Sequence, residues 1–100
     1  MIVPMLHLAE LVEVSKSATD EMMDLAKQSQ RVIGLVYRPD GYNLGMNLGA
    51  AAGAGIAAHL HLHVLPRWAG DANFMTTVGE TRVLPEALAD TYRKLKPHFS

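Results

Sequence analysis

The sequence contains no cysteine, carries almost no net charge and has no long apolar run. Without cysteine, the chain can form neither a disulfide nor a thiolate metal site. A formal net charge of −1 gives no basic excess of the kind that non-specific nucleic-acid binding requires. No apolar stretch approaches the roughly 20 residues of a membrane span, and the first residues lack the pattern of a secretory signal. We therefore expect a cytoplasmic protein whose partners include neither nucleic acid nor a membrane.

The sequence does contain enough apolar material for one packed domain. Its 100 residues, 49% of them hydrophobic, correspond to a single domain over 1–100. The hydrophobic periodicity alternates between that of strands and that of helices. We expect an α+β fold, with an antiparallel sheet of three clear strands, one long helix and a short C-terminal helix. In chain order, the predicted elements are a strand over 2–6, a helix of about 20 residues ending near Tyr37, strands over 42–48 and 58–65, and a helix from Pro85.

Proline, serine and glycine set the predicted boundaries. Pro4 indicates that the first strand lies at an edge of the sheet. Ser17 with Asp20 resembles a capping box at the start of the long helix, and Pro39 begins the turn that ends it. Pro66 is expected to close the last strand. The C-terminal helix is predicted to turn four residues toward the core: Leu84, Leu88, Tyr92 and Leu95.

Three of the five histidines lie within five positions, each separated from the next by a leucine. The run is His59-Leu60-His61-Leu62-His63-Val64-Leu65. In a β-strand, residues two apart share a face, so the imidazoles are expected on one face and the aliphatic side chains on the other. The preceding strand alternates in the same way, and the short Gly49–Ala57 loop makes the two strands antiparallel neighbours. Asn43 and Asn47 should then join the histidines.

Three interpretations of the histidine strand compete. The histidines could be solvent-facing polar residues, which explains one histidine better than three. Two of them could bind a metal ion, with further ligands from His7, Asp71 or His98. All three could not easily do so, because positions i and i+4 of a strand lie about 13 Å apart.

The third interpretation is nucleophilic catalysis at phosphorus. A neutral imidazole is an adequate nucleophile when an acceptor holds its other nitrogen. Neighbouring imidazoles can then contact phosphate oxygens or protonate the leaving group. Glycine-rich backbone and amide side chains bind phosphate oxygens without adding charge. Asn47 and the loop containing Gly53 and Gly55 are candidates for that role.

The histidine run fits the His-φ-His-φ-His-φ-φ signature of the histidine triad (HIT) family at every position. Three further segments resemble the branch that contains bacterial diadenosine polyphosphate hydrolases and phosphorylases. They are Met1-Ile2-Val3-Pro4 with His7, Asp40-Gly41-Tyr42-Asn43-Leu44-Gly45-Met46-Asn47-Leu48-Gly49, and Leu65-Pro66-Arg67-Trp68 with the following Gly70-Asp71-Ala72-Asn73-Phe74-Met75. The resemblance covers essentially the whole chain.

The resemblance implies an enzyme that attacks the α-phosphate of a nucleotide through a covalent nucleotidyl-histidine. His61 would be the nucleophile and the backbone carbonyl of His59 would orient it. His63 would contact the α-phosphate or the leaving group, and His7 would support the site. Asn47 would bind near the scissile phosphate. The substrates implied are dinucleoside polyphosphates or nucleoside phosphoramidates.

The resemblance also bears on cofactors and partners. It implies a homodimer and no metal at the histidine cluster, although Mg²⁺ could accompany the substrate polyphosphate. Arg67 would reach the polyphosphate tail, and a solvated loop arginine is an equal alternative.

The chain departs from the family pattern in two places. Relatives carry further residues before Met1, including a hairpin that lines the nucleoside pocket, so we expect an N-terminally short HIT domain. Gly55-Ile56 replaces a polar residue found in many relatives. A non-catalytic nucleotide-binding remnant and a histidine-ligated metal hydrolase therefore stay open as alternatives.

Overall fold

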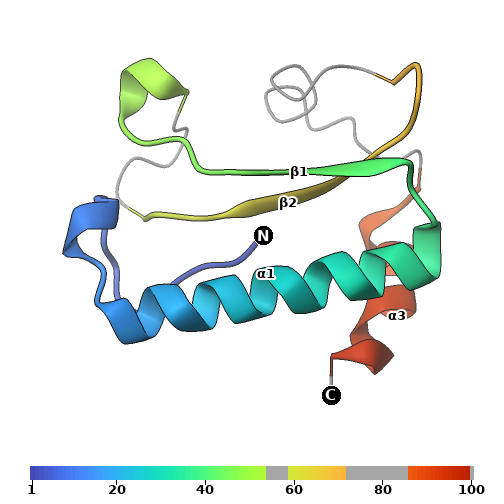
Figure 1. Ribbon diagram of the computed structural model, residues 1–100, viewed down its shortest axis with the longest axis horizontal. Coiled ribbons are helices and arrows are strands. Elements are labelled where there is room, and N and C mark those ends of the chain that lie inside the picture. The colour runs from blue at the N-terminus through green and yellow to red at the C-terminus, as the bar shows by residue number, and fades with distance from the viewer. Residues whose placement is uncertain (54–58, 72–85, 100) are drawn as a thin grey trace.

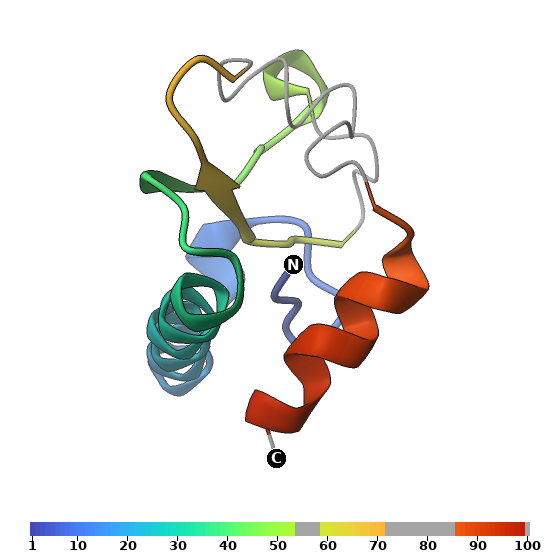
Figure 2. The same cartoon turned by 90° about the vertical axis from the view of Figure 1, so that its right-hand side faces the viewer.

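The two central strands lie over one long helix in the computed structural model, which describes residues 1–53, 59–71 and 86–99. Helix α1 runs along the strands, and α3 crosses near one end of α1 (Figure 1). Seen from the side, α1 and α3 diverge below the strands, and the N-terminus lies between them (Figure 2). The elements are the 3₁₀ turn η1 (Leu11–Glu13), α1 (Lys16–Tyr37), β1 (Gly41–Gly45), η2 (Ala50–Ala52), β2 (His63–Arg67), α3 (Leu88–Leu95) and η3 (Lys96–His98). The α+β class is confirmed.

The N-cap of helix α1 lies two residues before the predicted cap Ser17. Ser15 is the N-cap, and its hydroxyl accepts a hydrogen bond from the backbone N–H of Ala18 at 3.2 Å. The capping box on Ser17 and Asp20 is therefore wrong, because Asp20 instead bonds Lys16 one turn earlier at 2.7 Å. The helix ends at Arg38, whose left-handed backbone (φ 49°) terminates the α-helical pattern before the turn.

Strands β1 and β2 pair antiparallel, as predicted, with Gly45 opposite His63 and Asn43 opposite Leu65. Both strands are shorter than predicted, and β2 runs through Pro66 instead of ending before it. Within the described part of the chain, β1 is the one strand that pairs with His63–Arg67. A strand at the edge of a sheet tolerates proline, because one of its sides makes no ladder.

The predicted strand over 2–6 is wrong, so the described sheet has two strands and not three. What forms is a single antiparallel bridge between Ile2 and Leu62. Pro4 explains the difference, because it lacks the N–H that the next pair of the ladder needs. The segment still lies beside β2, but as an irregular arm.

The core lies between the strands and α1, on the face that carries the aliphatic side chains of the histidine run. Its buried members are Ile2, Met22, Ala26, Ile33, Leu62 and Val64, with Tyr37, Tyr42, Met46 and Leu95 packed against them. Leu60 is also buried. This confirms the prediction that Leu60, Leu62 and Val64 form the inner side of the strand.

Helix α3 contributes less to the core than predicted. Leu95 packs against the core, but Leu88 and Tyr92 are 86% and 62% exposed. An apolar hollow of about 610 Å³ is lined by Leu25 and Ile33 of α1 and by Leu88 of α3, among others, and Leu88 stays largely in water. Leu84 and Pro85 lie outside the described residues. None of the described helices is long and apolar enough to cross a membrane.

Candidate active site

Exposure alternates along the histidine run. His59, His61 and His63 are half-buried, whereas the three aliphatic residues between and after them are buried. The regular strand begins only at His63, and His59 lies in a bend. The alternation therefore continues beyond the strand itself, and bonds from another part of the chain hold the first histidines in place.

His61 is oriented by a backbone carbonyl. Its Nδ1 lies 3.1 Å from the carbonyl oxygen of His59. A carbonyl oxygen can only accept, so Nδ1 must carry the proton, and the neutral ring then holds its lone pair on Nε2. This is the protonation state that a nucleophilic imidazole needs.

His63 lies next to His61 and opposite a glycine. The two rings are 4.7 Å apart between centroids and nearly perpendicular. Burial lowers the pKa of His63, and the neighbouring His61 lowers it further, because two adjacent imidazolium ions would repel each other. Gly45, directly across the ladder, has no side chain to cover this position. The alternation of Asn43, Gly45 and Asn47 predicts that Gly45 shares the histidine face, but it does not predict that Gly45 lies directly opposite His63.

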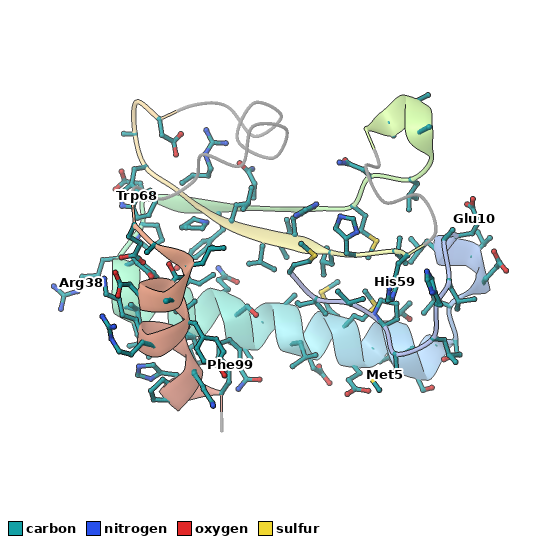
Figure 3. The ribbon with its side chains drawn as sticks, turned by 180° about the vertical axis from the view of Figure 1, so that it is seen from behind. Met5, Glu10, Arg38, His59, Trp68 and Phe99 are labelled. Atoms are coloured by element: carbon teal, nitrogen blue, oxygen red, sulfur yellow. The ribbon has the colours of Figure 1, made fainter. Side chains whose placement is uncertain are left out.

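His59 and His7 form a second pair of rings, with centroids 4.6 Å apart. The Nε2 atom of His59 donates to the backbone carbonyl of Pro4 at 3.0 Å. In Figure 3, His59 lies beside the N-terminal segment that carries Met5. The four histidines thus form two ring pairs, and the Pro4 carbonyl is a contact that the sequence analysis did not predict.

Asn47 and Gly53 lie at the loop that follows β1. The side-chain amide of Asn47 donates to the Gly53 carbonyl at 3.4 Å, and the Gly53 N–H donates to Ala50. The backbone N–H of Gly53 is thus already engaged within its own turn. Gly55 lies outside the described residues.

Arg67 lies at the far end of β2 from His61 and is held by two neighbours. Its guanidinium makes a salt bridge to Asp71, and Nη1 donates to Asn43 at 2.6 Å. The bonds from Arg67 and from the Trp68 backbone lower the pKa of Asp71. Arg67 is therefore partly neutralised and is not a solvated loop arginine.

Comparison with known proteins identifies the chain. The model of the HIT domain family matches residues 1–70. The chain belongs to the HIT domain family.

Relatives of known sequence and structure agree with the assignment. AP-4-A phosphorylase of Mycobacterium tuberculosis is 46% identical over all 100 residues, which make up 51% of that protein. The chain thus spans about half the length of the curated relatives it matches. A Zn-bound histidine triad family protein from Mycobacterium smegmatis is 26% identical and superposes with a TM-score of 0.73, over 96% of this chain and 64% of that one. A Hit-like protein from Bartonella henselae, 16% identical, shares the fold (TM-score 0.75) over 97% of this chain and 67% of that one.

The described part of this HIT domain brings no three His, Asp or Glu side chains together so that they could hold a metal ion. Of the additional ligands considered from the sequence, Asp71 is held by Arg67, and His98 lies in η3 near the C-terminal end. The histidines instead form two ring pairs, and in each pair one ring, that of His59 or His61, is held by a backbone carbonyl.

Proposed function

We propose that this HIT domain catalyses nucleotidyl transfer from dinucleoside polyphosphates, with His61 as the nucleophile. The observation that carries the proposal is the bond from His61 Nδ1 to the His59 carbonyl, which leaves the lone pair on Nε2. The family membership and the 46% identity to an AP-4-A phosphorylase support this class of substrate. Nucleoside phosphoramidates, which also present an α-phosphate, are the second substrate class.

The reaction would proceed in two displacements at the same phosphorus. Nε2 of His61 attacks the α-phosphorus, a P–N bond forms, and the bond to the bridging oxygen breaks, so that the nucleoside polyphosphate leaves. Water then breaks the P–N bond and releases a nucleoside monophosphate. Inorganic phosphate as acceptor would release a nucleoside diphosphate.

The neighbouring residues would serve the phosphate oxygens and the leaving group. His63, whose ring contacts that of His61, would bind the α-phosphate or protonate the departing oxygen. Asn47 would bind near the scissile phosphate with the amide that now holds Gly53. The Gly53 N–H already bonds Ala50, so the loop of Gly53 and Gly55 would have to release that bond or use another N–H to supply a backbone donor. His7 would support His59 by ring contact.

Arg67 would contribute at a distance. It lies four residues along β2 from His63, roughly 13 Å at the rise of a strand, which suits the far phosphates of a substrate tail. Each of the three guanidinium nitrogens already donates one hydrogen bond to Asp71 or Asn43. A phosphate would therefore be bound by the second N–H of Nη1 or of Nη2. The histidine cluster would need no metal, and Mg²⁺ would arrive with the polyphosphate.

The assembled state would be a cytoplasmic homodimer. Helix α1 exposes apolar side chains that a monomer leaves in water, including Met23 at 51% and Leu35 at 64%. A second copy packed along α1 would remove this apolar surface from water. Sedimentation equilibrium that gives the monomer mass at micromolar concentration would remove the dimer from the proposal.

The test is turnover of diadenosine tetraphosphate and adenosine phosphoramidate by the chain and by His61→Ala, each with and without a chelator. We expect release of AMP, or of ADP when phosphate is supplied, and a loss of ~10³-fold or more in the variant, as for other nucleophile deletions. The variant should keep its melting temperature, because His61 is not in the core. A rate in His61→Ala close to wild type would overturn the proposal. Activity lost to chelator and regained with zinc would favour a metal hydrolase, and binding of AMP without turnover would favour a binding protein.

A further inference from the structure

The N-terminal arm, Ile2–Leu8, contacts the histidine run through its backbone. Ile2 and Leu62 exchange two hydrogen bonds of 2.8 Å each. In a regular antiparallel ladder the next pair of this kind, two residues further, would join Pro4 to Leu60. Pro4 has no N–H, so this pair cannot form. The ladder stops, and the arm's later carbonyls become available to other donors.

Two of these carbonyls hold the residue that orients His61. The Pro4 carbonyl accepts from Nε2 of the His59 ring at 3.0 Å. The Leu8 carbonyl accepts from the backbone N–H of Leu60 at 2.7 Å. The N–H of Leu60 and the C=O of His59 belong to one planar peptide unit. Fixing the direction of that N–H therefore fixes the direction of the carbonyl.

That carbonyl is the acceptor for Nδ1 of His61. We propose that the N-terminal arm sets the tautomer of His61, with His59 as the positioning residue whose ring is anchored on Pro4. The arm's carbonyls fix the His59–Leu60 peptide, and the oxygen of that peptide fixes the His61 ring. His7 contacts the other side of the anchored ring, with the planes 33° apart. This inference rests on the proposed role of His61 as nucleophile.

Losing the bond between the His59 ring and Pro4 would change which nitrogen of His61 carries the proton, even if the fold were kept. A neutral imidazole without an acceptor at Nδ1 populates both tautomers, and in one of them Nε2 carries the proton and has no lone pair. We expect His59→Leu to lower kcat by up to about 100-fold, as a small misplacement of a reactive group does, with KM little changed. His59→Gln, whose amide can still donate to Pro4, should recover most of the rate. His7→Phe, which keeps an aromatic ring in contact with His59, is the matched control and should keep the wild-type tautomer.

The decisive measurement is ¹⁵N NMR of the imidazole nitrogens in the full chain, because it reads the tautomer without turnover. In the wild type we expect His61 protonated at Nδ1 and His59 at Nε2. In His59→Leu the His61 nitrogens should shift toward a mixture of both tautomers, and in His59→Gln they should return. An unchanged His61 tautomer in a folded His59→Leu would overturn the proposal.

Pro4→Ala provides a second test that leaves every histidine in place. It restores the missing N–H, so the arm can continue its ladder to Leu60 and withdraw both carbonyls from their present partners. We expect the same shift of the His61 nitrogens, and a wild-type spectrum would count against the arm. If the tautomer shifts but no variant, nor the wild type, turns over nucleotide, the positioning is correct and the proposed function fails.

Discussion

The segment from His59 to Arg67, which includes β2, carries polar side chains at both of its ends, yet the two ends use different partners. At one end, Arg67 is matched by the carboxylate of Asp71. At the other, the nitrogens of His59 and His61 are held by backbone carbonyls. A carboxylate neutralises its partner and stabilises its charge, whereas a carbonyl orients a ring without adding charge. At the histidine end the rings are thus oriented without an added counter-charge. At the arginine end, much of the guanidinium charge is neutralised by a carboxylate of the same fold.

The largest expected effect comes from the buried side that both ends share. Leu62→Asp places a carboxylate where a 7% exposed leucine now packs in the core. Leaving a buried charge without a partner costs about 3–5 kcal/mol, which is a large share of the roughly 5–15 kcal/mol that stabilises a domain. We expect no cooperative unfolding transition by circular dichroism. A soluble, cooperatively folding variant would show that the two faces of the run are assigned the wrong way round.

The arginine end can be tested by changing the length of the substrate. Arg67→Met should raise KM for diadenosine tetraphosphate by about tenfold, the value of one hydrogen bond to a charged group. Adenosine phosphoramidate has no polyphosphate tail, so its kinetic constants should change little. Steady-state kinetics with both substrates would decide, and Asp71→Asn serves as the control for loss of the ion pair. Equal losses on the two substrates would mean that Arg67 serves the fold alone and would sharpen the contrast between the ends.

The histidine end should respond to pH near neutrality. Burial and His61 lower the pKa of His63 below the ordinary histidine value of 6.5, so the folded state resists a proton that the unfolded state takes up. His63 therefore contributes stability above pH 6.5 that is lost as the pH falls through and below that value. Urea unfolding between pH 8 and pH 5 should show a smaller loss in His63→Gln than in the wild type. If the free energy of unfolding fell equally with pH in both proteins, His63 would not be the cause of the pH dependence. We also expect His63→Ala to lower turnover less than His61→Ala.

The smallest effect concerns a third polar cluster, built like the arginine end. Glu86 accepts hydrogen bonds from Lys94, Tyr37 and Thr91 and so ties α3 to α1. These bonds, that of Lys94 first, lower the pKa of Glu86 to about 2. Its contribution to stability is present above pH 4.5, the ordinary pKa of a glutamate, and is lost as the pH falls toward 2. Glu86→Gln should flatten the melting temperature between pH 4.5 and pH 2. A wild-type slope in that variant would exclude Glu86.

The sequence predicted the parts of this domain that depend on periodicity. The alternation of histidine with aliphatic residues correctly predicted the buried face of the run, and the 3.6-residue period predicted α1. The predictions that failed concern positions where two neighbouring residues could play the same structural role, or where one residue changes the partners of others. Ser15 and Ser17 are both good caps, and the residue type alone does not choose between them. Pro4 correctly indicated that the pairing of its segment is limited. It did not predict that the Pro4 carbonyl would bond the His59 ring.

The arm also has a consequence for the order in which the chain folds. The bond from His59 to Pro4 spans 55 residues of sequence, whereas the bonds of α1 span only four. Long loops close late, because the entropy of closing them precedes any gain from the contact. We expect amide protection in α1 to appear before protection of Leu60 and Leu62 in pulse-labelling hydrogen exchange. The reactive form of His61 would then belong to the finished fold alone, and partly folded chains would carry the histidines without the acceptor that orients them.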